Sequence, residues 1–192
     1  MKKLFEDFPY LENGRIILKR MREVDADALL NMKQSENVYR YLPTFLIEKQ
    51  YDDMSEVIRQ CNETLFLTKS AILMGIYLTE GATEKYCGIA EIYHYKADLA
   101  KVTIGYRLAE AFWGRGIATE VVQMMVNYLF FDTDVEMIIA SHFTSNPASG
   151  NVLKKNGFEM MASSVEQDWG FESKTVVDLW QLTKSNYIKQ KD

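Results

Sequence analysis

Between residues 101 and 108 the chain alternates strictly between apolar and polar side chains. The apolar positions are Val102, Ile104, Tyr106 and Leu108, and the polar or small ones are Lys101, Thr103, Gly105 and Arg107. A period of two predicts a β-strand. Further on, apolar residues recur at every fourth position from Ile117 to Leu129, which predicts an amphipathic helix reaching about Phe131. A strand, a turn and a helix therefore follow one another directly.

The turn between this strand and this helix contains two glycines, Gly114 and Gly116, and the helix opens with the small residues Ala118 and Thr119. The first turn of a helix leaves backbone N–H groups unpaired and carries partial positive charge. Because the glycines have no Cβ atoms, an anion can approach these N–H groups closely. The segment therefore predicts a phosphate-binding turn.

Two common nucleotide-binding motifs do not fit this turn. In a P-loop, lysine and a hydroxyl residue would stand where Ile117 and Ala118 stand, so nucleotide hydrolysis is disfavoured. A dinucleotide fingerprint requires a third glycine at Thr119 and an acidic residue after the next strand, but that strand ends in Ser141 and His142. A Gly-x-Gly turn alone is also typical of an ordinary tight turn before a helix.

The N-terminal third of the chain predicts one strand and two helices. Gly14–Arg20 has the pattern of a first strand, and Asp25 is placed to cap a helix that reaches about Gln34. Asn37–Ile47 has no clean period, and Lys49–Asn62 reads as a second helix.

The remaining chain predicts mostly strands. Three of them are joined by short polar turns, as in an antiparallel meander: Ala71–Thr79, Tyr86–Tyr95 and Ala100–Leu108. Val135–His142 is almost continuously apolar, as expected of a strand buried on both faces. A helix that opens at Pro147 and ends at Gly157 follows. The last segments are a pair of strands and a frayed tail: Phe158–Ser164, Lys174–Thr183 and Ser185–Asp192.

Length and composition favour one globular domain. We therefore expect the 192 residues to form a single domain, 1–192, with a core of about 14–183. With 22 basic and 27 acidic residues the net charge is −5, so binding to nucleic acid is not expected. Cys61 and Cys87 are expected to be reduced thiols. Acidic residues stand where a signal peptide would be apolar, and no stretch has the length of a membrane span, so we expect a cytoplasmic protein.

A second motif supports the phosphate turn. It reads Asn146-Pro147-Ala148-Ser149, followed by Lys155-Asn156-Gly157-Phe158. Together with Ile104–Leu108 and Trp113–Glu120, it resembles the GCN5-related N-acetyltransferase (GNAT) superfamily, and within it the branch that acetylates the N-termini of ribosomal proteins. The resemblance spans about 14–183, and three motifs in the right order are a specific signal. An aromatic residue at Trp113, where the superfamily often has Gln or Arg, is similar to the ribosomal-type branch.

This resemblance implies a GNAT-like α/β (α+β) fold: a twisted, mixed, mostly antiparallel sheet of about seven strands flanked by about four helices. Two strands, ending at Leu108 and His142, would splay and receive the pantetheine arm of acetyl-CoA, while the pyrophosphate lies on the glycine-rich turn. The residues implied in binding acetyl-CoA are Tyr106, Arg107, Leu108, Gly114, Arg115, Gly116, Ile117, Ala118, Thr119, Asn146 and Ser149. Asn146 is also placed to cap the following helix.

Direct acetyl transfer requires a base for the amine and a proton donor for the thiolate. The resemblance implies that Ser149 meets the thiolate as general acid, since Leu153 stands where many members have a tyrosine. Relatives often have an acidic residue where Thr103 stands, so Glu91 is the substitute base. Its strand face carries apolar neighbours, and an apolar cleft tunes a carboxylate toward proton transfer. His142 is the second candidate, as a proton relay near neutral pH.

The implied acceptor is a primary amine, either a protein N-terminal α-amine or a small molecule such as a polyamine, amino acid or aminoglycoside. Tyr39 and Tyr41 are candidates to line its pocket. The alternatives are a non-catalytic acyl-CoA-binding module and, third, a nucleotide-binding enzyme. Two histidines and two scattered cysteines form no ligand cluster, so no metal is expected. Apolar terminal strands leave a homodimer open.

Overall fold

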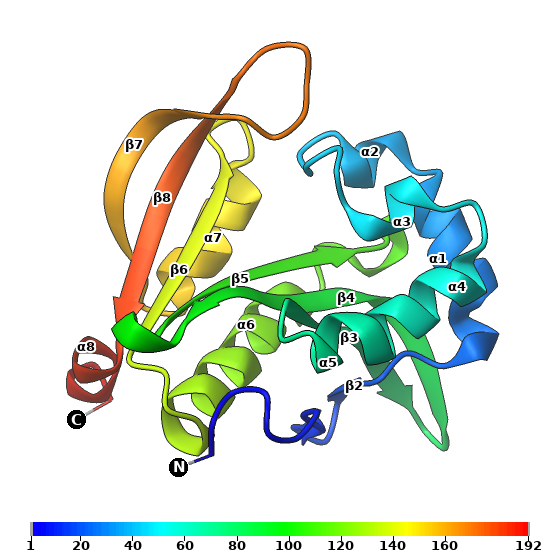
Figure 1. The fold of residues 1–192 in the computed structure, drawn as a ribbon, viewed down its shortest axis with the longest axis horizontal. Coiled ribbons are helices and arrows are strands. Elements are labelled where there is room, and N and C mark those ends of the chain that lie inside the picture. Colours follow the sequence, from blue (N-terminus) through cyan, green and yellow to red (C-terminus); the bar gives the residue numbers. More distant parts are fainter. Residues whose placement is uncertain (1, 192) are drawn as a thin grey trace.

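Residues 2–191, the part of the chain that the computed structural model describes, contain one eight-stranded sheet (Figure 1). The strand order is β1-β2-β3-β4-β5-β6-β8-β7, and all neighbours are antiparallel except the parallel pair β5 and β6. The strands are β1 (Leu11–Glu12), β2 (Ile16–Lys19), β3 (Ala71–Glu80), β4 (Thr83–Lys96), β5 (Lys101–Leu108), β6 (Met137–Phe143), β7 (Glu159–Gln167) and β8 (Thr175–Thr183). The predicted mixed, mostly antiparallel sheet is confirmed, with the two-residue β1 added to it.

Helices cover both faces of the sheet. On one face α6 (Ile117–Asn127) and α7 (Pro147–Lys155) contribute to a core cluster with β3, β4, β5 and β6. On the other, α1 (Ala26–Lys33) and α4 (Met54–Arg59) share a second cluster with β3 and β4. The shorter helices are α2 (Glu36–Tyr39), α3 (Ile47–Gln50), α5 (Leu65–Leu67) and α8 (Lys184–Lys189).

Strands β5 and β6 pair only at their beginnings. Their parallel register runs from Lys101 opposite Met137 to Thr103 opposite Ile139. Beyond that point β5 continues to Leu108 and β6 to Phe143, and the two diverge into the open V seen in Figure 1. The predicted splay is therefore present, and it leaves backbone donors and acceptors along both strands that require other partners.

The prediction that β6 is buried on both faces is wrong. Its residues alternate between buried and half-buried, with Ile138, Ala140 and His142 on the buried face. The half-buried face includes Ile139 and Ser141, which line the large cavity described below. The apolar composition of β6 is typical of a strand buried on both faces, but one of its faces lies beside an open cavity and is only half-buried.

The helix predicted over Lys49–Asn62 is divided into shorter pieces. Helix α3 ends before Tyr51, whose backbone is extended. Asp53 then starts α4, because its side chain accepts a hydrogen bond from the backbone N–H of Ser55. A π-helical turn at Gln60–Thr64 and the short α5 complete the segment. A capping aspartate inside the predicted helix is the physical reason for the break.

Asp25 precedes the predicted helix, but its side chain does not cap it. Its carboxylate instead accepts hydrogen bonds from the backbone N–H of Arg22 at 2.9 Å and from the hydroxyl of Tyr77 at 2.6 Å. Asp25 therefore links the loop after β2 to strand β3.

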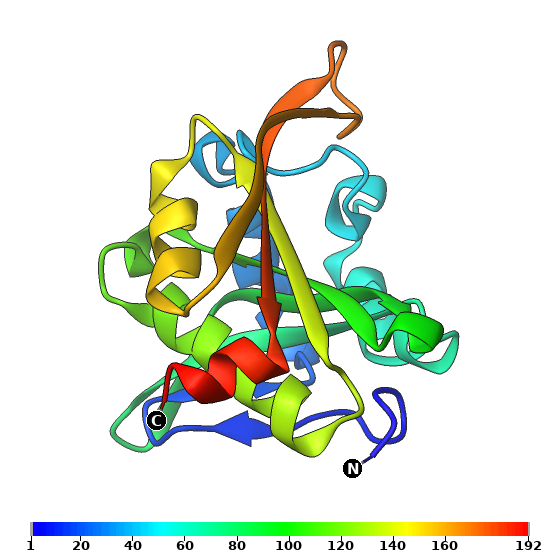
Figure 2. The ribbon, with the colours of Figure 1, turned by 90° about the vertical axis from the view of Figure 1, so that its left-hand side faces the viewer.

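The tail predicted to be frayed contains helix α8 (Figure 2). Thr183 caps it by accepting from the backbone N–H of Asn186. Tyr187 is buried, and its hydroxyl donates to Asn127 Oδ1 at 2.8 Å. One buried aromatic residue and one cap therefore hold a segment whose pattern is too short to predict a helix.

Candidate functional site

A cavity of about 1030 Å³ opens where β5 and β6 diverge. Its lining comes from the glycine-rich turn, from the first residues of α6, from β4, β5 and β6, and from α7. Two further segments complete it: residues 37–46, from α2 and the loop after it, and residues 167–169 at the end of β7. The sheet, helices α6 and α7 and these two segments thus converge on one space.

The glycine-rich turn has the conformation that requires glycine. Gly114 has φ +71° and Gly116 φ +76°, both in the left-handed region, and both residues line the cavity. The space beside Gly114 is open, and beside Gly116 the nearest atom is Glu120 Oε1 at 4.0 Å from where a Cβ would lie. Gly116 occupies the cap position of α6 without a side-chain cap, so the first N–H groups of α6 remain available to an anion.

Arg15, the residue before β2, holds this turn. Its Nη2 atom donates to the backbone oxygen of Arg115 at 2.8 Å, and its Nη1 atom lies 2.9 Å from Glu120 Oε1. Glu120 therefore carries a partly compensated charge close to the predicted phosphate position. Arg115 itself is exposed and lies outside the cavity lining, with its guanidinium 3.6 Å from Glu80.

Ser149 faces a tyrosine across the cavity. The hydroxyl of Tyr106 donates to Ser149 Oγ at 3.3 Å, and both residues line the cavity. Burial raises the pKa of Tyr106, so the phenol keeps its proton at neutral pH. Asn146 is the cap of α7, since its Oδ1 atom accepts from the backbone N–H of Ser149 at 3.4 Å.

On the opposite side of β5, Arg107 lies between two carboxylates. Its guanidinium is 2.6 Å from Glu48 Oε1 and 3.0 Å from Glu91 Oε1, and the side chains of Arg107 and Glu48 are almost fully buried. Burial acts to lower the pKa of Arg107, but these two carboxylates outweigh it and raise that pKa well above its usual range. Arg107 is therefore a permanent cation that fixes Glu91 on β4 and Glu48 on α3.

Glu91 lies at the base of the cavity, beside Gly105 of β5. A Cβ on Gly105 would lie 2.8 Å from Glu91 Oε1, so the glycine leaves the space that the carboxylate occupies. The purely apolar surroundings expected for Glu91 are absent because Arg107 is its neighbour.

His142 lines the cavity on the face of the sheet that packs against α7. Its Nδ1 atom lies 2.7 Å from the backbone oxygen of Phe143. Since a carbonyl only accepts, Nδ1 carries the proton in the neutral ring and Nε2 has the lone pair. Nε2 lies 4.0 Å from Asp178 Oδ2 and has no hydrogen bond among residues 2–191.

The two tyrosines predicted for the acceptor pocket are placed differently. Tyr41 lines the cavity, and its ring centroid lies 5.8 Å from that of Phe143. Tyr39 does not line it, because its side chain is buried and its hydroxyl donates to Glu48 at 2.8 Å. Tyr39 thus supports the charge cluster from behind.

The remaining predicted cofactor-binding residues meet in the same cavity. They are Leu108, Ile117, Ala118 and Thr119. Sequence reasoning missed the side chains of Tyr106, Arg107 and Trp169. The alternation in Ile104–Leu108 places Tyr106 and Arg107 on opposite faces of β5. This pattern could have predicted that their side chains act on different sides of the sheet.

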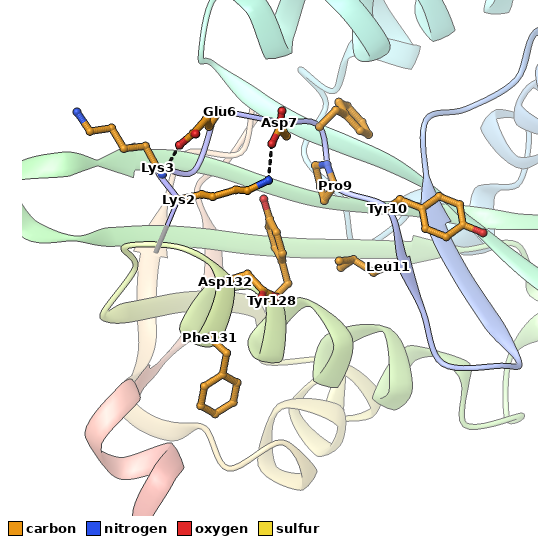
Figure 3. Close-up of a pocket in the computed structure, with 11 residues that line it drawn as sticks. Lys2, Lys3, Glu6, Asp7, Pro9, Tyr10, Leu11, Tyr128, Phe131 and Asp132 are labelled. Atoms are coloured by element: carbon orange, nitrogen blue, oxygen red, sulfur yellow. Dashed lines mark hydrogen bonds and ion pairs between the residues drawn. The ribbon is translucent and has the colours of Figure 1, made fainter.

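A second hollow, of about 640 Å³, lies beside the N-terminal segment (Figure 3). Lys2 is paired with Asp7 at 2.5 Å within it, and no predicted site residue lines it. Within residues 2–191, no His, Cys, Asp or Glu cluster is arranged to hold a metal ion. In the same range no helix has both the length and the apolar composition needed to cross a membrane.

Comparison with known proteins identifies the family. A family model described as an acetyltransferase (GNAT) domain matches residues 15–159. The uncharacterized N-acetyltransferase YoaA of Bacillus subtilis (strain 168) is 30% identical over 152 residues, which cover 79% of this chain and 84% of YoaA.

Two solved structures share the fold. The spermidine N-acetyltransferase of Vibrio cholerae, solved with CoA and spermine, has a TM-score of 0.74 at 16% identity and covers 92% of this chain and 99% of its own. RimL, the ribosomal L7/L12 alpha-N-protein acetyltransferase solved with coenzyme A, has a TM-score of 0.74 at 17% identity, with 91% and 98% covered. These two likenesses show the shared fold, and the family model together with the Bacillus relative leads to one conclusion: the chain belongs to the GNAT family of N-acetyltransferases.

Proposed function

We propose that this N-acetyltransferase transfers the acetyl group of acetyl-CoA directly to a primary amine, with a protein N-terminal α-amine or a small-molecule amine as acceptor. The observation that carries the proposal is the continuity of the cavity. It extends from the glycine-rich turn, through the gap between β5 and β6, to residues 37–46. A long donor and a separate acceptor can therefore meet within one continuous space.

The residues present suit coenzyme A. The open space at Gly114 and Gly116 and the free N–H groups of α6 suit a diphosphate. Lys155, which lines the cavity next to Asn156, lies near the same end, because the side chain of Asn156 donates to the backbone oxygen of Thr119. The unpaired backbone groups of β5 beyond Thr103 suit the amides of a pantetheine arm.

The reaction balances with one base and one acid. The amine nitrogen forms a bond to the carbonyl carbon of the thioester, the carbon–sulfur bond breaks, the amine loses one proton and the sulfur gains one. Ser149 is the proposed donor to sulfur, and the hydrogen bond from Tyr106 supplies Ser149 with a proton source. Neither group has to change its charge before the reaction begins.

Glu91 is the proposed base because it faces the acceptor side of the cavity. It lies on the sheet face shared with Ile89, Tyr93 and the second core cluster. His142 lies on the other face, beside α7. The amine proton therefore has a shorter path to Glu91, directly or through one water.

The test measures binding and turnover separately. Calorimetry with CoA measures affinity, and thiol release from acetyl-CoA measures acetyl transfer to a panel of peptides and small amines. We expect CoA binding and amine-dependent thiol release. Tight CoA binding without any acceleration by amines would instead support a non-catalytic acyl-CoA-binding module. Competition by ATP or NAD for the same site would favour a nucleotide-binding protein.

A further inference from the structure

The acceptor half of the cavity carries an aromatic wall, defined here as Tyr41, Phe45 and Trp169. All three residues line the cavity, and Phe45 is 59% exposed. Phe143 braces the wall from behind, because its ring centroid lies 5.8 Å from Tyr41 and 4.9 Å from Trp169, at 87° to the latter ring. These rings present apolar area to the cavity instead of to one another.

Two distant segments are fixed together to form this wall. The backbone N–H of Thr44 donates to the backbone oxygen of Trp169 at 2.9 Å, and the Thr44 hydroxyl donates to Gly170 at 2.9 Å. Gly170 has φ +81°, and Phe45 Cδ1 lies 3.5 Å from where its Cβ would be. The wall is therefore preorganised, and a ligand would not have to order it.

The same half of the cavity carries excess negative charge. Glu91 and Asp168 line it, and Glu48 lies directly behind Arg107. Arg107 pairs with Glu48 and Glu91, and with Asp168 included the four groups sum to −2. Lys155 also lines the cavity, but it belongs to the phosphate end of α7. The acceptor half therefore attracts a cation before that cation is deprotonated.

We propose that the preferred acceptor is a primary amine with an aromatic or branched aliphatic group next to the amino group. This preference rests on the proposed acetyl transfer. The carboxylates attract the ammonium, and the wall removes the neighbouring apolar group from water. An N-terminal Phe or Leu and a free arylalkylamine share this chemistry. An N-terminal Ser offers no apolar group to the wall, and spermidine has no aromatic or branched group next to its amino groups.

The first experiment compares acceptors with the full chain and acetyl-CoA. The panel consists of Phe-Ala-amide, Leu-Ala-amide, Ser-Ala-amide, phenylethylamine and spermidine, with thiol release as readout. We expect kcat/KM for the Phe and Leu peptides to exceed that for the Ser peptide by about tenfold to a hundredfold, the range that a hydrophobic pocket provides. A higher kcat/KM for phenylethylamine than for Phe-Ala-amide would identify a small-molecule acceptor, and the reverse order would identify a peptide N-terminus.

The second experiment assigns the preference to the wall. Phe45→Ala should lower kcat/KM for Phe-Ala-amide about tenfold, with the loss in KM, and leave Ser-Ala-amide and CoA affinity nearly unchanged. Phe131→Ala is the matched control, since Phe131 is 48% exposed and lies at the second hollow, outside the large cavity. An equal loss for both peptides, or none, contradicts the proposal.

The outcomes separate the two proposals. If Ser-Ala-amide or spermidine is the best acceptor, the acceptor preference is wrong and the acetyl transfer stands. If no amine on the panel accelerates thiol release while CoA binds, the acetyl transfer itself is wrong.

Discussion

Ser149 is half-buried on α7 and receives a hydrogen bond from Tyr106 of β5. A serine hydroxyl alone is a poor acid, whereas a serine linked to a buried phenol can pass a proton on and be reprotonated. Because burial raises the pKa of Tyr106, this supply of protons persists through neutral pH.

We therefore predict that Ser149→Ala and Tyr106→Phe lower kcat by about a hundredfold, the usual contribution of a positioned acid. CoA affinity should change less than threefold by calorimetry, because neither hydroxyl forms the phosphate turn. Ser145→Ala, an exposed serine just before α7, is the control and should retain full activity. Unchanged kcat in both variants would remove the pair from the mechanism.

Asp25 gives a residue-scale prediction about stability. Burial acts to raise the pKa of Asp25, but hydrogen bonds from Arg22 and Tyr77 outweigh it and lower that pKa. A carboxyl with a lowered folded-state pKa stabilises the protein above its unfolded pKa of about 3.9, and the contribution is lost as pH falls through the folded value.

Asp25→Asn should accordingly lower the free energy of unfolding by about 1.5–3 kcal/mol at pH 7, as expected for a buried bond to a charged group. Denaturant titrations at several pH values should show this difference shrinking below about pH 4. Asp27→Asn, at an exposed site in the first turn of α1, should cost less than about 1 kcal/mol. A pH-independent difference would mean that packing, not charge, is lost in Asp25→Asn.

At the residue scale the sequence predicts backbone roles better than side-chain roles. The roles of Gly114 and Gly116 can be predicted from the adjacent sequence, because a helix N-terminus and a positive φ depend on neighbouring residues. The sequence predicts a cofactor-binding role for the backbone of Arg107 and contains no signal for the pairing of its side chain with Glu48. The two are far apart in the chain, so their pairing depends on how α3 packs.

At the scale of elements, the ion-pair cluster joins α3 to β5 and β4. Arg107 is the shared partner of Glu48 and Glu91, so it fixes the acceptor side of the cavity as well as the proposed base. Removing it leaves the fully buried carboxylate of Glu48 without a counter-charge.

We predict that Arg107→Met lowers the free energy of unfolding by about 3–5 kcal/mol, the usual cost of breaking a buried pair from one side. Arg59→Met removes an exposed pair with Glu56 on α4 and should have a much smaller effect, because solvent screens an exposed pair. Chemical denaturation measures both. Equal small effects would show that water reaches Glu48 and solvates it.

Elements with a sustained pattern are predicted well. The meander β3–β5 and helices α6 and α7 have clear periods or caps within the segment itself. The chain from α3 to α5 is predicted less well, because Asp53 interrupts one apolar pattern by capping a new helix. Helix α8 depends on one long-range contact, that of Tyr187 with Asn127, which no local pattern contains.

At the scale of the whole molecule, the diverging strands divide the sheet into two parts with a cavity between them. The order of motifs predicts this splay through a family resemblance, and membership of the GNAT family is confirmed. The aromatic wall is not predictable in this way, because Thr44 and Trp169 meet only when the loop after β7 folds back over the loop before α3. If the proposed acceptor preference is right, that contact helps to determine which acceptor fits.

The most direct test of the account is the affinity of CoA for Gly116→Glu, measured by isothermal calorimetry. A glutamate there places bulk and negative charge where the diphosphate is proposed to bind. Gly81→Glu is the matched control, because Gly81 also has positive φ and open space around it, on the β3–β4 turn outside the cavity lining. We predict that wild type and Gly81→Glu bind CoA alike and that Gly116→Glu binds at least about a hundredfold more weakly, a difference of about 2.7 kcal/mol. Unchanged CoA affinity in a folded Gly116→Glu would contradict the placement of the phosphates on this turn.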